Sequence, residues 1–182
     1  MQRKNNTGFQ VVTTFATRMI VLFGSFIVSV ILARLLGPDG KGIVTALFVV
    51  PNIVISIADL GVRQASAYFI GRKIYHVEDI ISSSLILWIF TSFISVLIVL
   101  IYYLFGSTKE YGWLLVLIAL FYIPIKLLTS YLNGVIQGKQ KISNINKKEL
   151  LSLLVNLIGV LILVWVFDLG VYGASLVTLL VG

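Results

Sequence analysis

Six apolar runs separated by short polar gaps constrain this chain more than any other feature of its sequence. A helix needs about 20 mainly apolar residues to cross a membrane. The runs cover residues 11–36, 42–60, 80–105, 113–132, 150–167 and 171–182. The sixth holds only about 12 residues, too few to cross, so we expect the intact protein to continue after Gly182. The pattern predicts an all-α integral membrane protein, a six-helix transmembrane bundle.

The composition supports lipid as the solvent for much of the chain. Hydrophobic residues make up 59% of it and charged residues 12%, with a mean hydropathy of +1.05. The net charge of +7 comes from basic residues beside the apolar runs, without an aromatic-basic surface motif, so we expect no nucleic-acid partner. The absence of cysteine and the single histidine, His76, exclude disulfides, thiolate sites and multi-histidine metal sites.

The distribution of basic residues predicts the orientation of the chain. Nine lie at the amino terminus and in the even-numbered gaps, and three lie in the odd-numbered gaps. Basic residues are enriched on the cytoplasmic side of membrane proteins, so the amino terminus is predicted to be cytoplasmic. The first apolar run follows Arg3 and Lys4, but it is too long for a signal peptide and lacks a cleavage site before Arg34. We interpret it as a retained membrane span.

Two cations, Arg18 and Lys126, lie inside predicted spans. A charge at membrane depth is costly, so such residues face a partner or a wet cavity. Snorkelling to the headgroups is the alternative, because long basic side chains near a span end can reach the interface. Lys126 lies about 14 residues into its span, which favours a cavity.

Polar residues recur at helical spacing on five spans, so each set shares one helix face. The sets are Thr14, Arg18, Ser25 and Ser29; Thr45, Asn52, Ser56, Asp59 and Arg63; Ser84, Thr91, Ser95 and Tyr102; Tyr122, Lys126, Ser130, Asn133 and Gln137; and Ser152, Asn156 and Gly159. Serine, threonine and glycine are also common where membrane helices pack closely, which is the alternative interpretation. Asp59 and Arg63 are four residues apart and could instead form an ion pair.

Two prolines and the absence of catalytic motifs further restrict the helix geometry and the function that the sequence predicts. Pro51 and Pro124 lie inside spans, where proline tends to kink a helix, either for packing or to shape a cavity. The sequence has no catalytic pair of carboxylates on an outward loop, no nucleophile–histidine set and no Walker-type glycine loop. We therefore expect neither an enzyme nor an ATP-driven pump, and no cofactor.

Several segments, taken in order, resemble the amino-terminal half of the polysaccharide flippase family, within the superfamily of multidrug, oligosaccharidyl-lipid and polysaccharide exporters. The most specific is Ile31-Leu-Ala-Arg-Leu-Leu-Gly-Pro-Asp-Gly-Lys-Gly42. It is followed by Ala58-Asp-Leu-Gly-Val62, Leu132-Asn-Gly-Val-Ile-Gln-Gly138 and Gly170-Val-Tyr-Gly-Ala-Ser175, so the resemblance covers nearly the whole chain.

The resemblance implies two six-helix lobes around a central cavity, with this chain as the amino-terminal lobe. It implies alternating access that moves a lipid-linked oligosaccharide to the outer leaflet of the bacterial cytoplasmic membrane for surface polysaccharide biosynthesis. Family members have about twelve to fourteen spans, so either a second half follows or two chains associate. We expect a monomer at full length, in a lipid bilayer, with H⁺ or Na⁺ as a possible coupling ion.

The resemblance also gives the polar residues candidate roles. Arg18, Arg63 and Lys126 would neutralise an anionic diphosphate, and Asp59 would bind a coupling ion. Sugar hydroxyls would bond to the remaining candidates, Asn52, Asn133, Gln137 and Asn156. The alternatives are a drug or cation antiporter of the same fold, which would favour acidic residues, and a membrane-embedded glycan-modifying enzyme, which would need a large catalytic loop.

Overall fold

In the computed structural model, every regular element is a helix throughout residues 3–106, 112–140 and 142–182, the parts of the chain that the structure describes. The elements are α1 (Arg3–Ala58), α2 (Val62–Arg72), α3 (Val77–Phe105), α4 (Trp113–Gly138), α5 (Ile142–Gly159), the π-helix η2 (Val160–Val166) and α6 (Gly170–Val181). The predicted all-α class is confirmed. Lys109, Lys141 and the side chains of Arg3 and Lys4, which entered the orientation count, lie outside the described residues.

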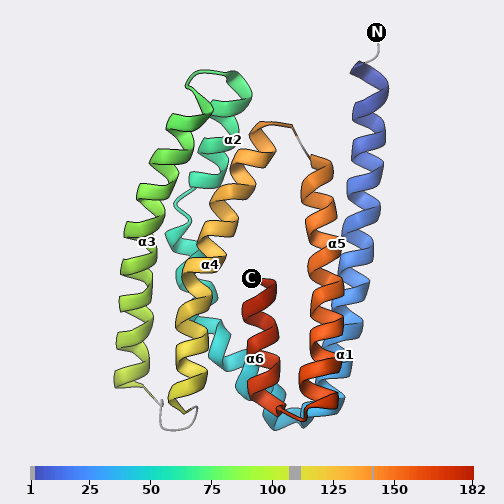
Figure 1. The fold of residues 1–182 in the computed structure, drawn as a ribbon, viewed down its shortest axis with the longest axis vertical. Coiled ribbons are helices and arrows are strands. Elements are labelled where there is room, and N and C mark those ends of the chain that lie inside the picture. Colours follow the sequence, from blue (N-terminus) through green and yellow to red (C-terminus); the bar gives the residue numbers. More distant parts are fainter. Residues whose placement is uncertain (1–2, 107–111, 141) are drawn as a thin grey trace.

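Helix α1 turns sharply at Gly37 and therefore consists of two arms. Gly37 has φ 71° and ψ 176°, a conformation that a residue with a Cβ rarely adopts, and Pro38 follows it. Figure 1 shows the two arms running in opposite directions from this turn. The ammonium of Lys41 donates to the carbonyl of Ser29 at 2.9 Å and to its hydroxyl at 2.6 Å, which ties the arms together. The arms contain the first two predicted spans.

Several helices extend beyond the predicted apolar runs. The polar gap expected between Gly134 and Glu149 is largely helical, because α4 continues to Gly138 and α5 begins at Ile142. Four helices in the described residues are long and apolar enough to cross a membrane, one of them being the merged segment Val12–Arg72, and the shorter apolar helix Gly170–Val181 follows them. The six-span count stays a prediction.

The helices form two groups, each with its own apolar core. One core lies between the second arm of α1, α3 and α4, and includes Leu47, Val99, Ile123 and Leu127. The other lies between the first arm of α1, α5, η2 and α6, and includes Val28, Val160, Val164, Ala174 and Val177. Helix α6 lies between the groups at the end opposite the amino terminus (Figure 1). The two groups therefore meet at that end of the bundle.

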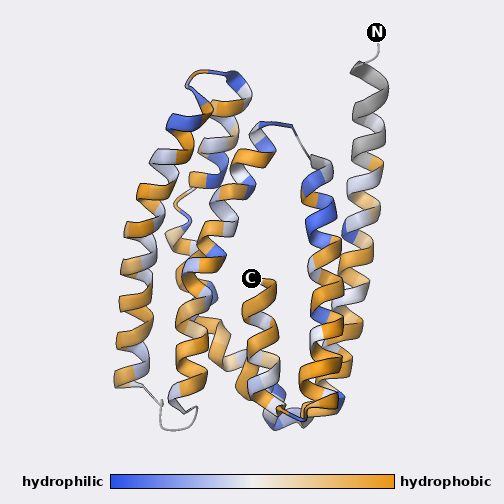
Figure 2. Ribbon diagram, in the orientation of Figure 1, coloured by the Kyte–Doolittle hydropathy of each residue, from blue (hydrophilic) through white to orange (hydrophobic). Residues whose placement is uncertain are grey.

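The outer surface of the bundle is strongly apolar. Large side chains such as Phe26, Phe93 and Trp165 are about two-thirds exposed, at 65%, 65% and 66%. Figure 2 shows hydrophobic residues along the helices and hydrophilic residues at the helix ends and on the first turns of α5. Such a surface would be unstable in water but suits contact with lipid. The protein is a multi-pass membrane protein.

Candidate functional site

A cavity of about 600 Å³, lined by charged, polar and apolar side chains, lies between the two groups of helices. Its lining residues include Val181 and Gly182 at the carboxyl end of α6. In Figure 1 this end of α6 lies in the middle of the bundle, so the cavity extends from there towards the amino-terminal end. The valine-rich core of the second group lies about one turn away along α1, α5 and α6. Val28 and Val160 come after the lining residues Ser25 and Asn156, and Val177 comes before the lining residue Val181. This apolar layer therefore borders the cavity on one side.

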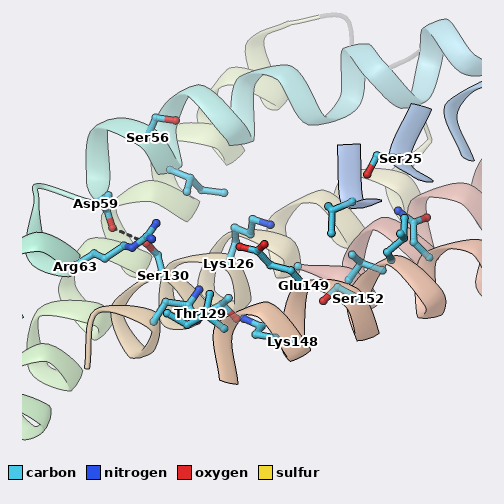
Figure 3. Close-up of a pocket in the computed structure, with 18 residues that line it drawn as sticks. Ser25, Ser56, Asp59, Arg63, Lys126, Thr129, Ser130, Lys148, Glu149 and Ser152 are labelled. Carbon is cyan, nitrogen blue, oxygen red and sulfur yellow. Dashed lines mark hydrogen bonds between the residues drawn. The ribbon is translucent and has the colours of Figure 1, made fainter. Parts of the chain in front are cut away.

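One wall is formed where the chain breaks between α1 and α2. Leu60 and Gly61 both have positive φ, 47° and 71°, so the helix stops and restarts at this point. The break places Asp59 and Arg63 on the cavity lining, with Ser56 one turn before them. Figure 3 shows the three side chains on this wall, where Ser130 donates a 2.9 Å hydrogen bond to the carboxylate of Asp59.

Tyr131, adjacent to Ser130 on α4, holds the same break from the inside of the bundle. Its ring is buried, and its hydroxyl donates to the carbonyl of Ala58 at 3.1 Å. The hydroxyl also lies 3.2 Å from that of Thr91 on α3. Buried polar groups are costly unless they are bonded, so this pair of contacts fixes the end of α1 against α3 and α4.

Close packing of α2 on α4 sets the backbone position of Arg63. A Cβ at Gly134 would lie 2.5 Å from the carbonyl oxygen of Arg63, and one at Gly138 would lie 2.7 Å from the Cβ of Ile70. Two glycines four residues apart form a small-residue face that lets membrane helices approach closely. The segment from Leu132 to Gly138, which carries part of the family resemblance, therefore has a packing role next to the cavity.

Helices α4 and α5 supply further parts of the lining, and both contribute a lysine. Lys126 lies 5.8 Å from the ring centroid of Tyr122, a cation–π geometry, and it is half-buried. Lys148 and Glu149 come from α5 and line the same cavity. In the described part of the chain, no ion pair within 4.0 Å joins the charges of this cavity. Its three cations and two carboxylates give a net charge of +1 (+3 − 2).

The structure brings together five of the eight residues predicted as a site from the sequence. They come from the α1–α2 break, α4 and α5, and all line the cavity: Asp59, Arg63, Lys126, Asn133 and Asn156. Their hydroxyl neighbours Ser130 and Ser152, from two of the predicted polar faces, line it as well.

The other three predicted residues lie outside the cavity lining. Arg18 is exposed; it precedes the lining residues Val21 and Ser25 by three and seven positions, so it shares their helix face. Asn52 is engaged in packing, because its amide donates to the carbonyl of Phe48 at 2.8 Å and its oxygen accepts from the hydroxyl of Tyr122 at 3.1 Å. Gln137 is exposed near the end of α4.

Lys148 and Glu149 are cavity residues that the sequence analysis assigned to a gap. Their segment is too polar to resemble a span, yet it is helical and amphipathic. Asn146 packs inward, with its amide donating to the hydroxyl of Thr14 at 3.1 Å, while Lys148 and Glu149 face the cavity. The spacing of residues 145, 149, 152 and 156 would have revealed the shared face if the predicted helix had been extended towards the amino terminus.

An apolar exterior and a charged, hydroxyl-rich hollow define a membrane protein with an internal polar site. The chain belongs to the polysaccharide biosynthesis protein family, whose model matches residues 5–182. This membership confirms the resemblance to proteins of polysaccharide biosynthesis and export. No curated protein and no solved structure matched the chain.

Proposed function

We propose that the chain is the amino-terminal lobe of a flippase that moves a lipid-linked oligosaccharide from the cytoplasmic to the outer leaflet by alternating access. Membership of the polysaccharide biosynthesis family supports the type of cargo. The cavity supports transport rather than catalysis, because a binding hollow between two helix groups can open and close when the groups move. The protein carries its cargo without changing it chemically.

The observation that carries the proposal is the set of three cations on different walls of one cavity, Arg63, Lys126 and Lys148. Charges inside an apolar bundle are costly and need either an internal counter-charge or a bound ligand. The carboxylates of Asp59 and Glu149 balance two of these three positive charges, so one positive charge has no internal counter-charge. The diphosphate of a lipid-linked sugar supplies the missing negative charge through strong charge-assisted hydrogen bonds.

The remaining lining suits the sugar part of such a cargo. Asn133 and Asn156 each offer an amide, and Ser25, Ser56 and Ser152 offer hydroxyl groups. Amides and hydroxyls both donate and accept hydrogen bonds, as sugar hydroxyls require. The lipid tail stays in the bilayer, against the apolar outer faces of the helices.

The cavity lies in the half of the bundle that carries the α2–α3 and α4–α5 connections (Figure 1). These connections hold most of the basic residues of the gaps. Because basic residues are enriched on the cytoplasmic side of membrane proteins, we assign this half of the bundle to the cytoplasmic side. The described conformation then corresponds to loading from the cytoplasmic leaflet. Asp59, bonded to Ser130, is the candidate for binding H⁺ or Na⁺ as the coupling ion.

The proposal is tested in the full-length protein, expressed in cells that lack their own flippase. We expect Lys126→Ala and Arg63→Ala to reduce surface polysaccharide at least tenfold at unchanged membrane abundance. Arg18→Ala tests whether the exposed arginine beside the cavity contributes as well. Arg34→Ala is the control, because Arg34 is exposed near the turn of α1 and outside the cavity. Normal polymer with both cavity variants, Lys126→Ala and Arg63→Ala, would remove these two cations from the mechanism.

A drug or cation antiporter of the same fold is the second candidate, favoured by the two carboxylates of the cavity, Asp59 and Glu149. Cationic cargo would need these groups and would be repelled by the lysines. The same cells distinguish the two functions: an antiporter raises resistance to cationic compounds and leaves the polymer unchanged, whereas a flippase does the reverse.

A further inference from the structure

We propose that a groove between α2 and α3 binds a phospholipid whose headgroup carries a primary ammonium, such as phosphatidylethanolamine. The groove has a volume of about 300 Å³ and lies near the end of the bundle where α2 connects to α3 (Figure 1). None of the described residues lines both the groove and the central cavity, so the inference goes beyond the proposed transport function. It concerns a resident lipid, not the transported one.

The polarity of the groove changes along α3 in the same order as the polarity of a lipid. Asp79, Ser83 and Leu87 line the groove at intervals of four residues, so they share one face of α3. This face runs from a carboxylate through a hydroxyl to an apolar side chain over about 12 Å of helix. Because α3 is long and apolar enough to cross a membrane, a lipid beside it presents its headgroup, its ester oxygens and its acyl chains in that order.

The deeper part of the groove provides an apolar bed for an acyl chain. Helix α2 lines it with Val62, Ala65 and Phe69. Ser66 and Ser84 are buried at its floor, and their hydroxyls lie 3.3 Å apart, within hydrogen-bond distance of each other. Because these two hydroxyls are bonded to each other, an acyl chain can cover them without burying an unpaired polar group.

The charge at the mouth of the groove selects the headgroup. Asp79 is the one charged side chain in the described lining, so the groove favours a cationic group and repels an anionic one. A primary ammonium pairs with a carboxylate and also donates hydrogen bonds to it. The quaternary ammonium of phosphatidylcholine has no N–H to donate, so we expect the groove to prefer phosphatidylethanolamine.

Tyr75 joins the groove to a neighbouring basic hollow. Its side chain lines the groove and also the adjoining hollow that contains Lys73 and His76. Its ring packs edge-to-face on Phe69, with 5.4 Å between the ring centroids. Tyrosine is common at membrane interfaces, where one part of the ring contacts lipid and the hydroxyl contacts water. In the bound state, the ammonium of the headgroup pairs with Asp79 and its phosphate pairs with Lys73 beyond Tyr75.

Native mass spectrometry of the full-length protein measures the lipid preference, with phosphatidylethanolamine and phosphatidylcholine of identical acyl chains as probes. Because Asp79 is exposed, we expect the most tightly bound phosphatidylethanolamine to bind about two- to fivefold more tightly than phosphatidylcholine. Asp79→Asn should remove this preference. Glu78→Gln, at the exposed neighbouring position outside the groove, should retain it. Equal binding of both lipids to the unmodified protein, or a preference that survives Asp79→Asn, contradicts the proposal.

Photocrosslinking locates the bound lipid. The full-length protein is placed in phosphatidylcholine nanodiscs with a small fraction of phosphatidylethanolamine that carries a photoactivatable group on one acyl chain. We expect crosslinks to the peptides of α2 and α3 that line the groove. Ala65→Trp fills the groove and should reduce these crosslinks several-fold, whereas Gln64→Trp, exposed and outside the lining, should not. Without crosslinks on α2 and α3, another segment or a second copy covers the groove, and the proposal is wrong.

A competition experiment separates the resident lipid from the transported cargo. Unlabelled phosphatidylethanolamine should reduce the crosslinks on α2 and α3, and the same amount of unlabelled polyprenyl diphosphate should leave them unchanged. If the polyprenyl diphosphate competes equally well, the groove holds cargo and the proposal of a resident lipid fails. The experiment involves no transport step, so its result does not depend on whether the flippase proposal is correct.

Discussion

Gly134 lies directly against the backbone of Arg63, so closely that a Cβ at position 134 would come within 2.9 Å of the Cα of Arg63. The backbone cannot move aside as a flexible side chain could. The position of Arg63, one of the cavity cations, therefore depends on a glycine without a Cβ at position 134 of α4.

The contact predicts that Gly134→Ala separates α2 from α4. Overpacking of this kind costs about 1–3 kcal/mol, which exceeds the gain of about 1 kcal/mol from replacing glycine in a helix. We expect a lower thermal unfolding temperature in detergent and reduced surface polysaccharide. Gly42→Ala is the matched control, because nothing lies within 4 Å of a Cβ there. Equal behaviour of the two variants would show that α2 and α4 are not in close contact.

Neighbouring residues of α4 should separate stability from transport. Tyr131→Phe removes the bond to the carbonyl of Ala58 and should reduce the free energy of unfolding by about 0.5–1.5 kcal/mol. Ser130→Ala removes the bond to Asp59 on the cavity side and should reduce transport more than stability. Unfolding in denaturant and the polymer assay, run on both variants, measure the two effects. If the Ser130→Ala protein is stable and fully active, the hydrogen bond that orients Asp59 is not needed for transport.

The Lys41–Ser29 contact should stabilise the turn of α1. Lys41→Ala removes a cation that bonds two oxygens of Ser29 on the opposite arm, and hydrogen bonds from a charged donor contribute about 1.5–3 kcal/mol. We expect faster proteolysis at the turn around Gly37 and a lower unfolding temperature. Arg34→Ala removes an exposed cation from the same end of the bundle and should behave as the unmodified protein. If both substitutions have the same small effect, the contact does not hold the arms together.

Two amides of α4 distinguish the cavity seen in the structure from the polar face predicted by the sequence. Asn133 lines the cavity, whereas Gln137, one turn later on the predicted face, is exposed outside it. We expect Asn133→Ala to lower the polymer level several-fold and Gln137→Ala to leave it unchanged. A loss of similar size in both variants would mean that the site extends to the end of α4.

The sequence was sufficient for the helical class and for part of the cavity wall, since helical spacing alone placed Asp59 with Arg63 and Lys126 with Asn133. It could not distinguish a polar group that lines the hollow from one that bonds a neighbouring helix. Asn52 illustrates this limit, because its engagement by Tyr122 depends on how two distant segments pack. Lys148 illustrates another limit, because hydropathy detects where a helix is apolar and misses polar turns that continue it.

The valines beside the cavity have an electrical consequence. If the cavity opens to the cytoplasm as proposed, it carries the potential of that solution, and the membrane voltage would fall mainly across the apolar layer of Val28, Val160 and Val177. A charged headgroup bound among the cavity cations, as proposed, would have crossed little of that voltage. The voltage should therefore act on the step that moves the headgroup past the level of this layer, and hardly at all on cargo binding.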